Sequence, residues 1–266
     1  MPTFMVKDGQ FWLDDHPLFI HAGEFHYFRA PADQWEHRLN LLLQAGFNTV
    51  AVYIPWLWHQ PQPELSDVDG HTHPLRDLAG FLDLATRMGL YIIARPGPYI
   101  MAETINEGIP QWVFDQHPQV AFVGQDGQPQ NIVSYLHPDY LACVEGWYRD
   151  VFHVLTPRQI THGGNILMIQ LDNEMAMLQW LRNKTDINPD TLGRFAAHLQ
   201  ARYGDGLPQR YPAASLTDFL RDQLCTPQPP YGERVIEDYR RFYRTYLRDY
   251  MEWLWERARI RGPRPG

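Results

Sequence analysis

Strand-like and helix-like segments alternate through the first two thirds of the chain, and this alternation constrains the fold more than any other feature. Strands are expected over residues 19–28, 49–54, 90–94 and 165–172. Amphipathic helices are expected between them, over residues 32–45, 75–88 and 139–155. Strands joined by helical crossovers build a parallel sheet. The pattern therefore predicts an α/β fold.

The alternation of strands and helices is interrupted in two places. A polar stretch over residues 96–138, with a turn signal at Asp126-Gly127, is too long for an ordinary connection, and such long loops are usually functional. Beyond the fourth strand the pattern is helical, with the last long helix expected over residues 233–260 and no fifth strand predicted. A chain of 266 residues can form one large domain or two small ones. We expect residues 1–266 to be a single, incomplete domain.

Charge and aromatic content narrow the class of partner. The chain has 23 basic and 31 acidic residues and a net charge of −8, which argues against nucleic acid or an anionic membrane surface. A neutral or polar small substrate fits better. Aromatic residues make up 14% of the chain and nine are tryptophans, a content that suits either the stacking of sugar rings or plain core packing.

Localisation signals are missing from the sequence. The first residues contain no basic region followed by an apolar run of about 7 to 15 residues. No stretch approaches the roughly 18 apolar residues of a membrane span. Cys143 and Cys225 are far apart and have no metal-ligand spacing around them. The expectation is a cytoplasmic protein that needs neither cofactor nor metal; its oligomeric state is not predicted.

Polar side chains lie at the carboxyl ends of all four expected strands. They are Glu24 and His26, Tyr53, Arg95, and then Gln170, Asp172 and Glu174. Parallel barrels place their active sites at this edge, so we expect these groups to share one pocket. From the pattern alone, Glu174 is either a structural acid paired with an arginine such as Arg95 or a catalytic group with a tuned pKa.

Four stretches in order carry a family resemblance. They are H-Y-F-R at residues 26–29, V-Y-I-P-W-L-W-H-Q-P at 52–61, R-P-G-P-Y-I-M-A-E at 95–103 and Q-L-D-N-E at 170–174. Together they resemble the catalytic barrel of glycoside hydrolase family 35, the β-galactosidases. The resemblance implies the amino-terminal part of a TIM (β/α)8 barrel, truncated after about the fourth strand and its helices. It also implies hydrolysis of terminal β-galactosides with retention of configuration.

The resemblance assigns roles to individual residues. Glu174 would be the general acid/base, and Asn173 would hydrogen-bond the 2-hydroxyl of the sugar. The remaining matches to galactose-binding positions are Tyr53, Met101, Ala102 and Glu103. Glu103 would hold sugar hydroxyls, although a role as the buried partner of Arg95 stays open.

The catalytic nucleophile has no match in the chain. Retaining glycosidases need two carboxyl groups about 5 to 5.5 Å apart, and in the resembling family the nucleophile lies well downstream of the acid/base. The chain alone is therefore expected to be inactive. Glu24, Glu107 and Asp172 are candidates to replace the nucleophile, but each is better explained as a hydrogen-bonded or solvated acid.

Departures from the family pattern keep two alternatives open. The chain has Leu57, Gln60, Met101, Thr104 and Met175 where the family usually has other residues, so the pocket is expected to be reshaped. One alternative is a related barrel glycosidase that acts on another β-linked sugar. The other is a carbohydrate-binding or scaffold protein without catalysis.

A histidine pair in a polar turn raises the question of a metal. His71-Thr72-His73 follows Asp67 and Asp69, but no further ligands are spaced for a metal site, so a solvated loop is favoured.

Overall fold

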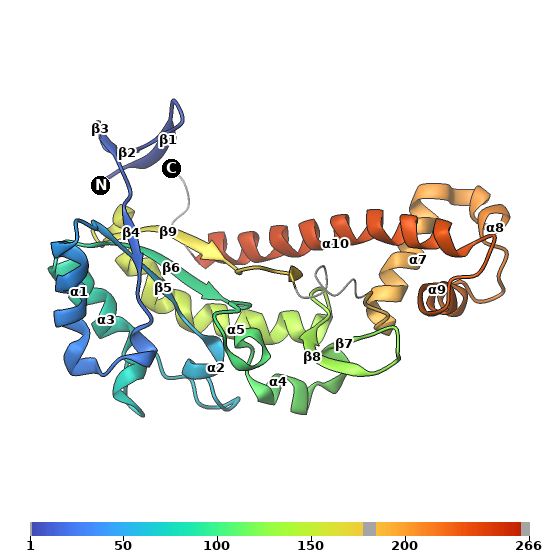
Figure 1. The fold of residues 1–266 in the computed structure, drawn as a ribbon, viewed down its shortest axis with the longest axis horizontal. Coiled ribbons are helices and arrows are strands. Elements are labelled where there is room, and N and C mark those ends of the chain that lie inside the picture. The colour runs from blue at the N-terminus through green and yellow to red at the C-terminus, as the bar shows by residue number, and fades with distance from the viewer. Residues whose placement is uncertain (1, 178–184, 262–266) are drawn as a thin grey trace. The chain divides into compact units, whose positions relative to one another are not determined.

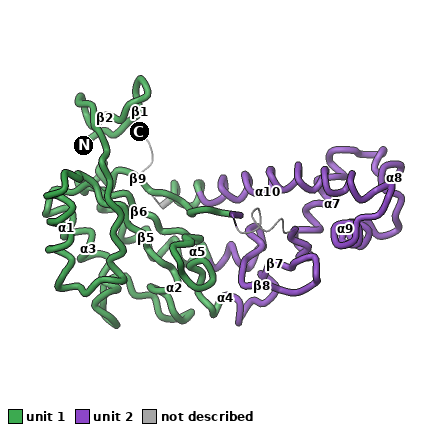
Figure 2. Tube along the Cα trace, in the orientation of Figure 1, with its two compact units in different colours: residues 1–112, 144–175, 255–266 green, residues 113–143, 176–254 purple. Residues whose placement is uncertain are grey.

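The structure is a computed structural model that describes residues 2–177 and 185–261. The chain divides into two compact units (Figure 2). Unit 1 comprises Met1–Trp112, Val144–Met175 and Trp255–Gly266, and unit 2 comprises Val113–Cys143 and Ala176–Leu254. The expectation of one incomplete domain over residues 1–266 stays a prediction.

A parallel sheet forms the centre of unit 1 (Figure 1). Its described strands, in hydrogen-bonded order, are β4 (Ala22–Glu24), β5 (Thr49–Tyr53), β6 (Tyr91–Gly97) and β9 (Ile166–Leu171). The helices that connect them include α1 (Trp35–Gln44), α3 (Leu78–Arg87) and α5 (Pro138–Leu155). The predicted parallel sheet with helical crossovers is confirmed.

One face of this sheet is buried under helices. Side chains of β5 and β6 that alternate toward this face are fully buried: Val50, Val52, Ile92 and Ala94. Helix α3 contacts both β6 and α1, and it buries its apolar stripe, which consists of Leu78, Phe81, Leu82 and Ala85. On β6 the alternate residues Tyr91, Ile93 and Arg95 are only half-buried. The strand therefore has the two-sided character that its sequence predicted.

The first strand is shorter than predicted. Only Ala22–Glu24 of the expected residues 19–28 is a strand, and Tyr27–Arg29 forms a 3-10 turn (η1). The indole nitrogen of Trp35 donates to the carbonyl oxygens of Tyr27 at 3.1 Å and Ala30 at 3.0 Å. These bonds, together with the complete burial of Tyr27, fix the chain in a turn where a strand would continue.

An antiparallel sheet precedes the parallel one and was not predicted. It consists of β1 (Phe4–Lys7), β2 (Gln10–Leu13) and β3 (His16–Leu18). Lys7 pairs with Gln10 across Asp8-Gly9, whose φ angles of 52° and 73° are both positive. An Asp-Gly pair between two strands is a strong signal for such a hairpin, so the sequence contained this information.

Unit 2 contains a hairpin and most of the helices that follow β9. Its hairpin is β7 (Ala121–Val123) and β8 (Pro129–Val133), turned at the predicted Asp126-Gly127. The helices are α7 (Pro189–Tyr203), α8 (Leu207–Arg210), α9 (Leu216–Cys225) and the Gly232–Leu254 part of α10 (Gly232–Arg261). The last of these confirms the long helix predicted over residues 233–260. No strand is found in residues 185–261.

A buried carboxylate connects parts of unit 2. Asp186 accepts hydrogen bonds from the Ser134 hydroxyl at 2.7 Å, the Thr191 hydroxyl at 2.8 Å and the Val123 amide at 3.2 Å. Burial raises the pKa of this carboxyl group even though the hydrogen bonds oppose the shift. Asp186 therefore joins the hairpin to the start of α7.

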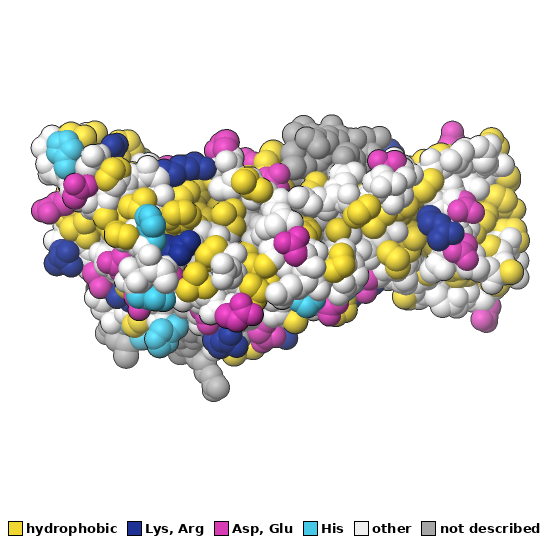
Figure 3. All heavy atoms as spheres, turned by 90° about the horizontal axis from the view of Figure 1, so that it is seen from below, with side chains coloured by type: hydrophobic (Ala, Val, Ile, Leu, Met, Phe, Trp, Pro, Cys, Tyr) yellow, Lys and Arg dark blue, Asp and Glu magenta, His cyan; other side chains and the backbone are white. Residues whose placement is uncertain are grey.

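The helices, and the face of the surface drawn in Figure 3, lack two features of membrane and polyanion-binding proteins in the part of the chain that the structure describes. Among the described residues, no helix is both long enough and apolar enough to cross a membrane. On the face drawn in Figure 3, Lys and Arg side chains lie in separate small groups among acidic and hydrophobic side chains.

Candidate active site

The carboxyl ends of the parallel strands meet at one edge of the sheet in unit 1. Tyr53 ends β5 and is in register with Arg95 of β6. Strand β6 ends at Gly97, in register with Leu171, the last residue of β9. Glu24 ends β4. This is the edge at which barrel enzymes carry their active sites.

Hydrogen bonds join the segment after β9 to the segment after β6. The Asn173 amide nitrogen donates to Tyr99 O at 2.8 Å, and its side-chain Nδ2 donates to Ile100 O at 3.1 Å. Gln170 Nε2 donates to Asn173 Oδ1 at 3.0 Å. Asp172 is buried and accepts from the Tyr99 amide at 2.9 Å. Asn173 is thereby held in one orientation, and Asp172 has a structural role.

Glu174 is exposed at the end of this segment. Burial raises the pKa of the Tyr53 hydroxyl; Arg95 lowers it, and the negative charges of Glu24 and Glu174 raise it. Glu174 and Asp172 both have left-handed backbone, with φ of 57° and 54°. Such conformations cost about 1–3 kcal/mol each and are concentrated at functional sites.

The matched residues Met101, Ala102 and Glu103 form a turn after β6. All three have positive φ, at 56°, 48° and 50°. Ala102 is buried in a small apolar cluster with Tyr53 and Ile100, whereas Glu103 is exposed. The structure therefore brings Tyr53, the turn and the Asn173-Glu174 pair together.

Arg95 is paired with Glu24 rather than with Glu103 or Glu174. Its Nη1 lies 2.7 Å from Glu24 Oε2, and its guanidinium lies 4.7 Å from the centre of the Tyr53 ring. The Glu103 side chain has no hydrogen-bond or ion-pair partner among the described residues. The alternative in which Glu103 is the buried partner of Arg95 is therefore wrong: Glu103 is exposed, and Arg95 pairs across β5 with Glu24 at the end of β4.

A polar network on the same edge was only partly foreseen. His26 Nε2 lies 2.8 Å from Glu24 Oε1, and Arg29 Nη1 lies 2.7 Å from His26 Nδ1. Arg29 Nη2 donates to Ala102 O at 2.6 Å. Strand alternation placed Glu24 and His26 on one side, but it carried no signal for Arg29, which lies in the unpredicted turn η1.

The family of the chain follows from comparison with known proteins. The sequence signature of glycosyl hydrolases family 35 matches residues 10–202. The chain belongs to this family.

Curated proteins similar to this chain are named for different activities. An exo-beta-D-glucosaminidase of Thermococcus kodakarensis is 36% identical over 256 residues, covering 92% of this chain and 32% of that protein. A beta-1,2-glucosyltransferase of Ignavibacterium album is 34% identical, with 97% of this chain and 36% of that protein covered. The beta-galactosidase of Mus musculus is 36% identical over 64% of this chain and 23% of that protein. The chain spans about a third of the length of the first two relatives.

Solved structures confirm the predicted fold class. A beta-galactosidase from Marinomonas ef1 has a TM-score of 0.69 at 16% identity, covering 92% of this chain and 36% of that chain. A beta-galactosidase from Halorubrum lacusprofundi has a TM-score of 0.68 at 17% identity, covering 92% of this chain and 35% of that chain. The parallel sheet of the family 35 chain is thus part of a TIM barrel, with β4, β5, β6 and β9 as four of its strands.

Buried aromatic residues support the end of β6 in this family 35 site. The Trp147 indole donates to Pro96 O and the Tyr148 hydroxyl to Gly97 O, both at 2.8 Å. Trp147 stacks on Trp56, which belongs to the short helix α2 (Trp56–His59). These contacts fix the strand just before the segment that carries Tyr99 and the turn at residues 101–103.

Gln60, one of the departures from the family pattern, has a clear structural role. Its Oε1 accepts from the Trp56 indole at 2.7 Å, and its Nε2 donates to Pro63 O at 2.8 Å. The amide therefore satisfies a buried indole donor on one side and a backbone carbonyl on the other. It departs from the family residue without leaving a polar group unpaired.

His59, the last residue of α2, is fully buried. Its Nδ1 donates to the Asp67 carbonyl at 2.6 Å, so Nε2 is left to accept a hydrogen bond from the Tyr27 hydroxyl. Burial lowers the pKa of His59 to about 4, although the Asp67 carbonyl and the Asp67 charge oppose the shift. A cation at this position is therefore disfavoured.

Because His59 is buried, we expect the folded protein to lose stability in acid. In the unfolded chain His59 takes up a proton near its ordinary pKa of 6.5, whereas the folded protein resists protonation until about pH 4. The unfolded state binds more protons in this window, so stability is lost as pH falls from about 6.5 to about 4, by about 3 kcal/mol in total. Urea unfolding across this range should show the loss, and His59→Gln should flatten it. The exposed His37→Gln control should leave the slope unchanged; equal slopes in all three proteins would contradict the assignment.

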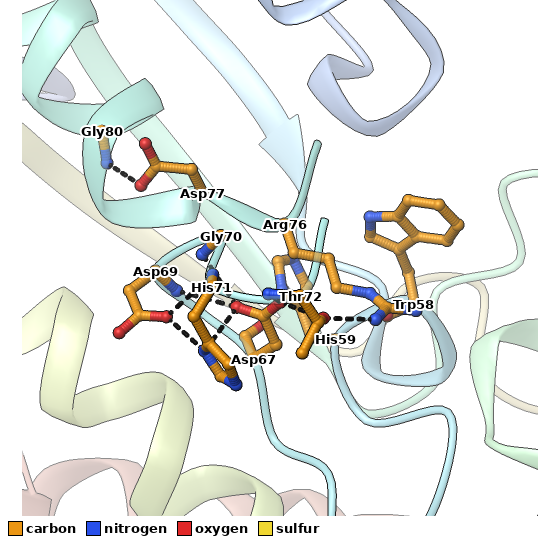
Figure 4. A network of polar contacts seen from close by, with 10 residues as sticks. All are labelled: Trp58, His59, Asp67, Asp69, Gly70, His71, Thr72, Arg76, Asp77 and Gly80. Atoms are coloured by element: carbon orange, nitrogen blue, oxygen red, sulfur yellow. Dashed lines mark hydrogen bonds and ion pairs between the residues drawn. The ribbon is translucent and has the colours of Figure 1, made fainter. Parts of the chain in front are cut away.

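The loop with the suspected metal ligands is organised around a buried acid (Figure 4). Asp67 is fully buried and accepts from the amides of Gly70 and Thr72, each at 2.8 Å, and from the Thr72 hydroxyl. His71 Nδ1 lies 2.6 Å from exposed Asp69 and 3.2 Å from Asp67. Burial opposes ionisation of Asp67, but the hydrogen bonds from Thr72 and Gly70 outweigh it and lower its pKa. Both Asp67 oxygens are thus engaged in holding the loop.

Proposed function

We propose that this chain carries the acid/base side of the active site of a retaining glycosidase, with Glu174 as the general acid/base. The observation that supports this most is the arrangement at the sheet edge. Asn173 and Glu174 follow β9, and hydrogen bonds join their segment to the segment after β6. Tyr53 ends β5, the neighbour of β6 on its other side, and the negative charge of Glu174 raises the pKa of its hydroxyl.

The proposed steps use groups already oriented by the fold. Glu174 protonates the glycosidic oxygen as the bond to the leaving group breaks, and it later removes a proton from the attacking water. Asn173 has one N–H on Ile100 O, so its second N–H is available for the 2-hydroxyl of the sugar. Exposed Glu103 accepts hydrogen bonds from other hydroxyls, and Tyr53 and Ala102 contact the ring.

The second carboxylate is proposed to come from outside these residues. Retention requires a nucleophile about 5 to 5.5 Å from the acid/base. All three acids considered as replacements have other interactions: Glu24 pairs with Arg95, Asp172 accepts from the Tyr99 amide, and Glu107 is also engaged. We therefore propose that the 266-residue chain alone binds sugar but does not turn it over.

The substrate we propose is a terminal β-galactoside. Support comes from the matched set Tyr53, Met101, Ala102, Glu103 and Asn173, and from the neutral amide of Asn173, which suits a hydroxyl at C2. A second candidate is a terminal β-glucosaminide or β-glucoside. It is favoured by the relatives that match over nearly the whole chain, which are named for glucosamine or glucose chemistry.

Initial rates on three aryl glycosides test this proposal. The protein is prepared both at its full encoded length and as residues 1–266, and it is supplied with the β-galactoside, β-glucoside and β-glucosaminide of one aryl alcohol. Highest kcat/KM for the galactoside at full length, with no turnover by residues 1–266, is the expected result. Preference for the glucosaminide would favour the second candidate, and binding without turnover at full length would indicate a non-catalytic protein.

A further inference from the structure

Arg29 reaches the sugar-binding turn from a different part of the chain. Its Nη2 donates to the Ala102 carbonyl oxygen at 2.6 Å and lies 3.4 Å from the Glu103 carbonyl oxygen. We propose that Arg29 is a positioning residue that holds the turn at residues 101–103 in its sugar-binding shape. The inference rests on the function proposed above, in which Ala102 and Glu103 contact the sugar.

The turn has a shape that its own residues disfavour. Met101, Ala102 and Glu103 are consecutive left-handed residues and none is glycine, so side-chain sterics oppose the conformation at each position. The Thr104 amide and hydroxyl both donate to the Met101 carbonyl, at 3.0 and 2.7 Å. Those bonds close the turn at its first carbonyl. Arg29 supplies donors to the two carbonyls that follow.

The guanidinium is itself held in place. Arg29 Nη1 lies 2.7 Å from His26 Nδ1, and His26 Nε2 lies 2.8 Å from Glu24 Oε1. A guanidinium only donates, so Nδ1 accepts, and Nε2 therefore carries the hydrogen and donates to Glu24. The other Glu24 oxygen accepts from Arg95, whose guanidinium lies over the Tyr53 ring. One network thus runs from the turn to Tyr53.

Because the network connects the turn to Tyr53, Arg29 affects sugar binding as well as the local stability of the turn. The turn and Tyr53 are two walls of the proposed sugar site, and each is contacted by an arginine that shares the Glu24 carboxylate through the network. Loss of Arg29 removes the donors to the turn while leaving the Glu24–Arg95 pair intact. The expected defect is in sugar binding, with Glu174 still present for chemistry.

The test compares Arg29→Met, Arg29→Lys and the control Arg38→Met. Arg38 is an exposed arginine of α1 that contacts Gln34. At full encoded length, Arg29→Met should raise KM for the aryl β-galactoside and Kd for galactose by about tenfold or more, the loss expected for a charge-assisted hydrogen bond. The kcat should change less than KM, because ground-state and transition-state binding are lost together. Arg29→Lys should be intermediate, and Arg38→Met should match the unaltered protein.

Two further readouts separate positioning from general destabilisation. On a Glu103→Gln background, Arg29→Met should cost less than it does alone, because both act through the same turn. Hydrogen exchange of residues 100–108 should be faster in Arg29→Met than in the unaltered protein, and unchanged in Arg38→Met. Unchanged Kd and KM, or additive effects in the double variant, would overturn the proposal. If the unaltered protein binds no sugar, the proposed function fails. If, in addition, hydrogen exchange of residues 100–108 is the same in Arg29→Met as in the unaltered protein, the positioning role of Arg29 is also rejected.

Discussion

Glu174→Gln is expected to lower kcat/KM for an aryl β-galactoside with a poor leaving group by about 10³-fold, within the range for loss of a general acid. Glutamine has nearly the shape of glutamate but cannot deliver a proton to the glycosidic oxygen. Because Glu174 is exposed, the substitution should leave folding intact. Initial rates of the full-length protein and its thermal unfolding midpoint measure the two effects.

The matched control for this substitution is Glu36→Gln. Glu36 is an exposed acid in the first turn of α1, away from the strand ends that form the proposed site. The Glu36→Gln protein should retain the rate of the unaltered protein within about twofold, as expected for a surface substitution. A Glu174→Gln enzyme that keeps its activity on poor leaving groups would remove Glu174 from the mechanism.

Asp67→Ala is expected to lower the free energy of unfolding by about 3 kcal/mol. The substitution leaves the amides of Gly70 and Thr72 and the Thr72 hydroxyl without their buried acceptor, and a hydrogen bond to a charged group contributes about 1.5–3 kcal/mol. Asp69→Ala is the matched control, because Asp69 is an exposed acid of the same loop. It should change stability by less than about 0.5 kcal/mol. Urea unfolding at pH 7 measures both.

The Asp67 effect has a defined pH dependence. Folding lowers the pKa of this carboxyl group, so its stabilising contribution is present above the ordinary aspartate pKa of about 3.9 and is lost as pH falls toward the folded pKa. The difference between Asp67→Ala and the unaltered protein should therefore shrink in acid. A difference that grows below pH 4, or a larger effect of Asp69→Ala, would contradict this account of the loop.

The parallel sheet was predictable because its signals are local. Buried residues such as Ile92 and Ala94 alternate with less buried ones along a strand, and glycines such as Gly46 and Gly89 follow the helices that cover the sheet. The same alternation indicated on which side Glu24, His26 and Arg95 lie. The amino-terminal hairpin at Asp8-Gly9 was equally local, and it was missed although its signal is present.

The partners of the site residues were not predictable in the same way. Alternation gives the side of a strand and not the distance to a neighbour, so it could not choose between Glu24, Glu103 and Glu174 as the partner of Arg95. The turn at residues 101–103 has no glycine or asparagine to indicate left-handed backbone. Its shape depends on tertiary contacts such as the hydrogen bond from Arg29 to Ala102 O. The residues of the turn itself give no sign of such contacts.

The central claim is that Glu174 donates the proton to the departing oxygen, and a leaving-group series tests it most directly. The full-length protein and Glu174→Ala are compared on aryl β-galactosides whose phenols range from strongly acidic to weakly acidic, with the rate of glycosidic bond cleavage followed in each case. The account predicts that the variant loses little with the most acidic phenol, which departs without a proton, and progressively more as the phenol becomes less acidic. An equal loss across the series would contradict the assignment of Glu174 as the acid.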